Sequence, residues 1–195
     1  MAHSKRRKMV PAVESNPYAP PQTVVADVPE DTGEAGEPAF FPVSRTKLIV
    51  LTFCTLGIYE YYWLYKNWKL VRNRTGERIM PFWRAFFAVF FCYSLFDRVR
   101  KYRPDLPASQ IAAGPLAIAW IVLTVLHKLP DPYWLVTFGA AFVLLPVQSA
   151  IDAINRDVAP GHDPNARFTA WNWVAVILGG PFFLFAVYAT FYLPD

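Results

Sequence analysis

The feature that most constrains this chain is a set of apolar runs that contain no acidic residue, lysine or arginine. Three of these runs, at 106–127, 132–151 and 168–194, are 22, 20 and 27 residues long. A transmembrane helix needs about 20 mostly apolar residues, whereas a surface helix of a soluble protein keeps a polar face. The sequence therefore predicts three helices that span a membrane.

Two further apolar runs are too short to be ordinary spans. They cover 48–59 and 85–96, and each contains 12 residues. A run of about 10 to 14 residues is more typical of a re-entrant or interfacial segment. We therefore expect an all-α, polytopic membrane protein with three spanning helices and two short or re-entrant membrane-embedded helical segments.

The distribution of lysine and arginine favours re-entry and a cytoplasmic amino terminus. If all five segments span from a cytoplasmic amino terminus, the 19 basic residues divide into 12 inside and 7 outside. If both short segments return to the side from which they enter, 18 lie inside and only Lys128 lies outside. Basic residues concentrate in cytoplasmic loops, so the second arrangement is the better prediction.

The first short segment contains a plausible reversal of the chain at Thr55-Leu56-Gly57, because glycine tolerates a positive φ. Irregular backbone at membrane depth must be covered by protein or line a wet cavity. We expect the turn, with Thr55 and Gly57, to pack against other helices. The helix that follows should end near Gly76, and Gly179-Gly180-Pro181 is the strongest candidate for a kink in the last span.

Residues 1–42 form the predicted tail, and residues 43–195 form the predicted helical membrane domain. The tail contains seven prolines and few aliphatic residues. Such a segment buries too little apolar surface to offset the entropy lost on ordering. We expect residues 1–42 to be disordered and cytoplasmic.

A local motif connects the chain to known sequences. The stretch from Lys47 through Thr55-Leu56-Gly57-Ile58-Tyr59 to Tyr62-Trp63 resembles a family of small uncharacterised bacterial multi-span membrane proteins, which share a T-L-G-I-Y-x-x-Y-W signature. The resemblance is good over about 43–75 and weaker beyond. It implies a bacterial inner-membrane, multi-pass protein with a domain of unknown function, and it implies no activity or catalytic residue.

Three ionisable residues inside or beside the short apolar runs are candidates for a functional role, since charge within a membrane is costly. Glu60 directly follows the predicted turn and could bind a proton or cation; alternatively it is an interfacial carboxylate or the partner of Arg84 or another base. Arg84 and Asp97 flank the second run. The simpler interpretation has Arg84 reaching the headgroups and Asp97 ending a helix.

Enzyme motifs are absent from the sequence: it has no nucleophile elbow, phosphate loop, dinucleotide fingerprint or zinc-protease motif. We therefore expect no catalytic residue, no cofactor and no metal site. The basic residues are dispersed between apolar runs, which argues against nucleic-acid binding. The sequence predicts a non-enzymatic membrane protein that associates with the lipid bilayer, including anionic lipids, with copies of itself or with a membrane-protein partner at a basic cytoplasmic face.

An alternative function stays open. A small transporter or channel could use the re-entrant turn and Glu60. A weak internal repeat supports this alternative. Residues 62–83 and residues 147–173 each have the pattern of a helix that leaves the membrane, a polar loop and an aromatic segment that re-enters the membrane. Internal repeats are frequent in transporters.

Overall fold

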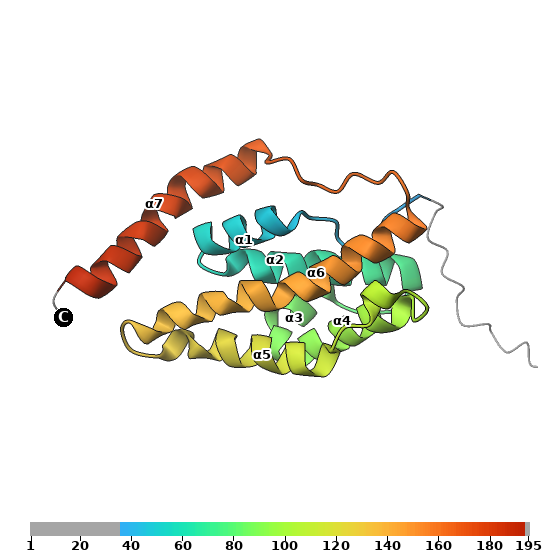
Figure 1. Ribbon diagram of the computed structural model, residues 1–195, viewed down its shortest axis with the longest axis horizontal. Coiled ribbons are helices and arrows are strands. Elements are labelled where there is room, and N and C mark those ends of the chain that lie inside the picture. Colours follow the sequence, from blue (N-terminus) through green and yellow to red (C-terminus); the bar gives the residue numbers. More distant parts are fainter. Residues whose placement is uncertain (1–35, 194–195) are drawn as a thin grey trace, which may run out of the picture.

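The computed structural model describes residues 36–193, so most of the predicted tail lies outside the described residues. Within 36–193 the chain is helical, without a β-strand (Figure 1). The α-helices are α1 (Arg45–Cys54), α2 (Ile58–Thr75), α3 (Pro81–Phe86), α4 (Ala88–Tyr102), α5 (Ala113–Val125), α6 (Gly139–Val158) and α7 (Ala170–Tyr192). The 3₁₀ helices are η1 (Pro107–Ser109), η2 (Leu126–Lys128) and η3 (Tyr133–Phe138). The predicted all-α fold class is confirmed.

Three helical stretches are long and apolar enough to cross a membrane: Pro107–Lys128, Tyr133–Val158 and Ala170–Tyr192. They contain α5, α6 and α7 and coincide with the three predicted spans. The 23 residues of α7 extend roughly 35 Å, more than the ~30 Å of a hydrocarbon core. No residue of α7 is buried, as expected of a helix that faces lipid.

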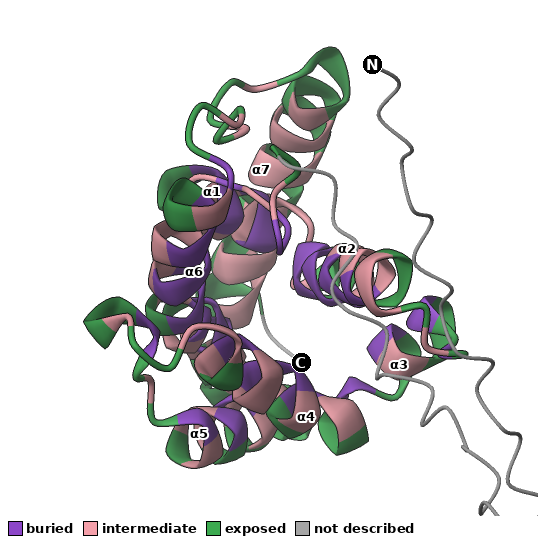
Figure 2. Cartoon of the chain, turned by 90° about the vertical axis from the view of Figure 1, so that its right-hand side faces the viewer, coloured by how far each residue is buried: buried purple, intermediate pink, exposed green. Residues whose placement is uncertain are grey.

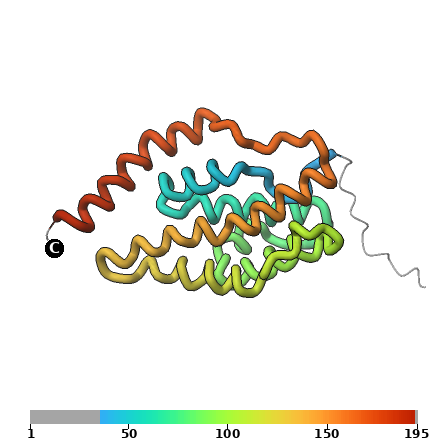
Figure 3. Tube along the Cα trace, in the orientation of Figure 1, coloured from blue at the N-terminus to red at the C-terminus, as the bar shows by residue number. Residues whose placement is uncertain are grey.

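The helices α1 and α2 form a hairpin that turns back inside the bundle (Figure 3). Ser44 caps the start of α1 by accepting a hydrogen bond from the Lys47 N–H. The turn places Leu56 at φ 50° and Gly57 at φ 86°, so the predicted need for glycine is met. With 10 residues, α1 reaches only about 15 Å, roughly half the thickness of a hydrocarbon core.

The second short segment is also divided into two helices. Pro81 occupies the first turn of α3, where its missing N–H costs nothing, as predicted. The helix stops at Phe87, whose ψ of 42° is not helical, and α4 begins directly afterwards. The predicted single run 85–96 is therefore interrupted near its start. The helix α3 lies close to α2, and α4 lies close to α5 and α6.

The chain has two distinguishable ends, defined by where its connections gather (Figure 1). One end, called here the basic end, holds the segment before α1, the connections 76–80 and 103–112, and the start of 159–169, which then runs alongside α1 to the start of α7. The opposite end, called the distal end, holds η2, η3 and the residues between them. The α1–α2 hairpin begins and finishes towards the basic end, and the chain between the connections 76–80 and 103–112, which contains α3 and α4, also leaves this end and returns to it. The hairpin turn 55–57 lies between the two ends, level with the middle of α7.

The core lies where α2, α4, α5 and α6 face one another, as the buried faces in Figure 2 show. Tryptophan dominates it: Trp63, Trp68 and Trp120 have no exposed surface. Amide side chains satisfy polar groups within this core. The Trp63 Nε1–H donates to Gln148 Oε1 at 2.7 Å, and the Gln148 amide donates to Asp152 at 2.7 Å. Trp68 differs, because its buried Nε1 has no partner among the described residues.

The end of the predicted tail belongs to the bundle. Ala39, Phe40 and Phe41 are buried, although the sequence analysis assigned residues up to 42 to the tail. The Asn155 side chain in α6 accepts from the Phe40 N–H at 3.0 Å and donates to the Phe40 carbonyl at 2.8 Å. Asn67 in α2 accepts from the Phe41 N–H at 3.0 Å. These amides supply the backbone partners that a short proline-flanked segment cannot make for itself.

At the predicted kink, residues 179–181, the helix α7 lies very close to the end of α1. The α7 helix continues through Pro181 without interruption. A Cβ atom at Gly179 would lie 1.8 Å from the Cys54 carbonyl oxygen, so α1 and α7 touch through backbone atoms there. Gly179 is therefore needed because any side chain would separate the end of α1 from α7.

Candidate functional site

The Glu60 side chain occupies an unusual position for a carboxylate. It lies in the first turn of α2, where the helix dipole favours an anion, and only 4% of the residue is exposed. Trp120 of α5 donates its Nε1–H to Glu60 Oε2 at 2.7 Å. In the described part of the chain, no lysine, arginine or histidine nitrogen lies within 4.0 Å of this carboxylate. The carboxylate is therefore buried without a counter-ion.

Arg84 is not the partner of Glu60. Its guanidinium lies over the Trp68 ring at 4.5 Å from the centroid and near the Phe91 ring at 5.3 Å. Such cation–π contacts strengthen where water is excluded. Arg84 thus joins α3 to α2 and α4, and the ion pair considered from the sequence is not formed.

Asp97 lies on α4, away from the Glu60 carboxylate. It pairs with Lys101 at 2.7 Å and with Arg100 at 2.6 Å, one turn further along α4. Hydrogen bonds first from Lys101 and then from Arg100 hold the pKa of Asp97 below its usual range. The helix α4 continues to Tyr102, so Asp97 pairs within the helix and does not end it.

Thr55 and Gly57 shape the turn that positions Glu60. The Thr55 hydroxyl donates to the Leu51 carbonyl at 2.7 Å and accepts from the Tyr59 N–H at 2.9 Å, so it joins the end of α1 to the start of α2. Gly57 supplies the left-handed residue that precedes α2. Both residues act on the backbone and set where the Glu60 side chain points.

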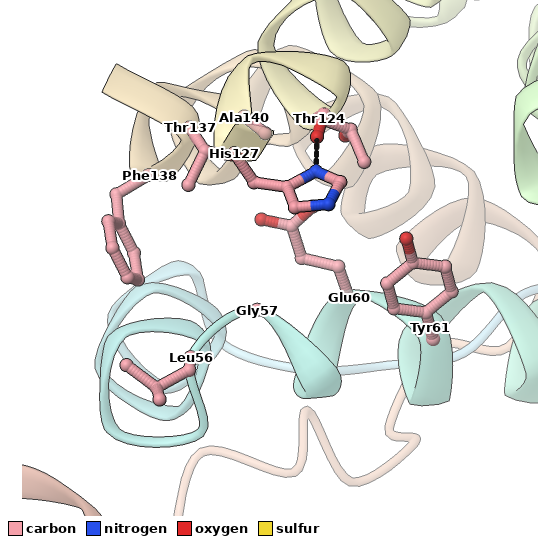
Figure 4. A pocket seen from close by; sticks show the side chains of 9 residues that line it. All are labelled: Leu56, Gly57, Glu60, Tyr61, Thr124, His127, Thr137, Phe138 and Ala140. Carbon is pink, nitrogen blue, oxygen red and sulfur yellow. Dashed lines mark hydrogen bonds between the residues drawn. The ribbon is translucent and has the colours of Figure 1, made fainter. Parts of the chain in front are cut away.

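A pocket of about 220 Å³ lies between the hairpin turn and the distal end of the bundle (Figure 4). Leu56, Glu60 and Tyr61 form one wall, and the Glu60 carboxylate points across it toward Thr124 and His127. The opposite wall comes from the end of α5 and the segment that leads into α6, with these side chains: Thr124, His127, Thr137 and Phe138. The predicted packing of the turn against other helices is thus partial, because Leu56 is 41% exposed.

One carboxylate oxygen in the pocket has no hydrogen-bond partner among the described residues. Glu60 uses Oε2 for Trp120, and no hydrogen bond of Oε1 is found in that range. The Thr124 hydroxyl beside the pocket is buried and also has no partner there. The His127 Nδ1 lies 2.7 Å from the Thr124 carbonyl oxygen. The pocket therefore offers a carboxylate oxygen at an apolar wall.

The sequence pointed to Glu60 but missed the residues that complete its surroundings. Trp120, Thr124 and Phe138 are 60 or more residues away and lie in apolar runs, where they resemble ordinary span residues. No signal in the sequence pairs them with Glu60. His127 differs from them in the sequence, because it is an ionisable residue at the end of a long apolar run.

Two groups can be distinguished among the described basic residues of the elements that lead into the basic end. Arg98, Arg100, Lys101 and Arg103 are paired with acidic side chains. In the first of these pairs, the Arg98 hydrogen bond lowers the pKa of Glu77. A second group on α2 and the following loop has no acidic partner within the described residues: Lys66, Lys69, Arg72 and Arg78. Arg72 and Arg78 are exposed.

Comparison of this chain with protein-family models, with curated proteins and with solved structures finds no match. The resemblance noted at Thr55-Leu56-Gly57 therefore remains an expectation from the sequence.

Proposed function

We propose that this protein is a non-enzymatic integral membrane protein that associates with anionic lipid headgroups through its basic end. The observation that carries the proposal is a group of positive charges without an acidic partner in the described residues: Lys66, Lys69, Arg72 and Arg78. Each lysine or arginine near an anionic surface contributes about 1 kcal/mol to binding. Cations already paired with carboxylates contribute less to binding. These four residues should therefore supply most of the attraction to anionic lipid.

The proposal includes a topology. The basic end faces the cytoplasm of a bacterial cell, in the inner membrane, and the amino terminus lies on the same side. The α1–α2 and α3–α4 hairpins enter from this side and return to it. Three observations support it: the 10-residue length of α1, the course of the chain, and the position of Lys128 at the distal end. A periplasmic signal from a reporter fused after Gly76 would overturn it.

Arg72→Gln is expected to weaken the preference for anionic lipid about fivefold, because it removes roughly 1 kcal/mol of surface attraction. The preference is measured by energy transfer from the tryptophans to labelled phosphatidylglycerol in vesicles of neutral lipid. Lys128→Gln is the matched control, since it removes one positive charge at the distal end. An equal effect of the two substitutions would contradict the proposal, and a wild type that ignores lipid charge would favour a protein partner instead.

A second candidate function is a small transporter or channel, and the buried, unneutralised Glu60 beside the pocket favours it. A carboxylate at membrane depth is costly, and such residues mark ion or substrate pathways in membrane proteins. If this function is correct, proteoliposomes that contain the protein should show proton or ion flux above that of empty liposomes, and Glu60→Gln should abolish it. Background leak from both wild type and variant would rule it out.

A further inference from the structure

We propose that the pocket beside Glu60 is a binding site for a small primary alkylammonium, with the Glu60 carboxylate as its counter-ion. The inference is independent of the lipid association at the basic end. It gives the second candidate function a ligand class, but it concerns binding alone. A flux assay and a binding assay can therefore fail separately.

The first step concerns charge. An isolated buried charge is destabilising unless it is paired, because the protein interior does not replace the lost hydration. The Glu60 carboxylate has one hydrogen bond in the described residues, from the neutral Trp120 indole, and no lysine, arginine or histidine nitrogen of that range lies within 4.0 Å of it. The Trp120 indole binds Oε2 of the carboxylate, and the Glu60 side chain points into the pocket (Figure 4). A cation that enters the pocket would supply the missing charge.

The second step concerns hydrogen-bonding capacity. An ammonium group has three N–H donors and no acceptor, as in the lysine side chain. The pocket offers one acceptor without a partner in the described chain, Glu60 Oε1. The Thr124 and Thr137 side chains line the same space. A primary ammonium can donate to this carboxylate oxygen, whereas a quaternary ammonium has no N–H to donate.

The third step concerns the rest of the ligand. Leu56, Ala140 and the rings of Tyr61 and Phe138 give the pocket apolar walls, which suit an alkyl group. A volume of about 220 Å³ is below the ~300–1,000 Å³ of drug-sized sites, so the ligand has few heavy atoms. The described residues contain no group of three or more histidine, cysteine, aspartate or glutamate side chains that could hold a metal ion. A metal cation is therefore a poorer match.

The test uses the full chain in neutral detergent, titrated calorimetrically with methylammonium, ethylammonium, tetramethylammonium and sodium ions at constant ionic strength. We expect saturable binding of ethylammonium, at least tenfold weaker binding of tetramethylammonium, and no saturable binding of sodium. Glu60→Gln should weaken ethylammonium binding at least tenfold. Glu77→Gln, which removes a carboxylate at the basic end, should leave it unchanged.

A further variant separates binding from folding. Glu60→Asp keeps the charge and should retain more affinity than Glu60→Gln, which would not hold if Glu60 served only to support the fold. The proposal is overturned if the wild type binds none of the ammonium ions, if sodium binds as tightly as ethylammonium, or if Glu60→Gln binds like the wild type.

Discussion

Gly179→Ala is expected to destabilise the protein by about 3 kcal/mol, the upper end of the usual cost of overpacking. The added Cβ would lie 1.8 Å from the Cys54 carbonyl oxygen and 2.8 Å from its carbonyl carbon. Both atoms belong to the backbone at the end of α1, so no side-chain rotation relieves the clash. We therefore expect α7 to move away from the hairpin.

Gly180→Ala is the matched control for this prediction. Its Cβ would meet only the Cys54 Sγ at 3.8 Å, an ordinary contact. Alanine also favours a helix over glycine by up to ~1 kcal/mol, so Gly180→Ala should be neutral or stabilising. Thermal unfolding in detergent measures both variants, and maleimide labelling of Cys54 reports the separation of α7. Equal stability of the two variants would show that α1 and α7 do not touch at Gly179.

Asn155→Ala is expected to destabilise the protein by about 2–5 kcal/mol and to release the segment before α1. The substitution leaves both the N–H and the carbonyl of Phe40 without their partner. Each buried backbone group that loses its hydrogen bond costs about 1–3 kcal/mol. Phe40 has no exposed surface, so water cannot replace the amide without opening the core.

The measurement for Asn155→Ala is thermal unfolding together with limited proteolysis near Phe40. Asn67→Ala loses one hydrogen bond to Phe41 in place of two, so its effect should be smaller. Asn73→Ala, on the exposed side of α2, should leave stability within about 0.5 kcal/mol of the wild type. An Asn155→Ala protein as stable and as protease-resistant as the Asn73→Ala protein would show that residues 39–41 are not held by this amide.

The residues around Glu60 show the difference between local and distant information. Glu60 stood out in the sequence because a carboxylate after an apolar run is costly wherever it lies. Its actual environment depends on Trp120, which is 60 residues away and donates the only hydrogen bond found for it in the described residues. An indole inside a 22-residue apolar run looks like any other span residue, so its role could not be recognised.

The same contrast applies to the charged candidates and the tail boundary. The ion pairs of Asp97 are local, because its partners Arg100 and Lys101 are three and four positions away on the same helix. The contact of Arg84 with Trp68 could not be predicted in this way, since it joins two helices. The boundary at residue 42 was set too late because Phe40 depends on Asn155, an amide 115 residues further along the chain.

The sequence by itself determined the helical class, the three long apolar helices, the turn at Gly57 and the concentration of basic residues in a few connections. These properties follow from composition, from segment length and from the local conformational freedom of glycine, which act within a few turns of chain. Only the tertiary structure decided that Glu60 meets Trp120, that Gly179 touches Cys54 and that Asn155 holds Phe40. Those contacts depend on which helix faces serve as partners, and apolar faces of similar composition do not encode that choice locally.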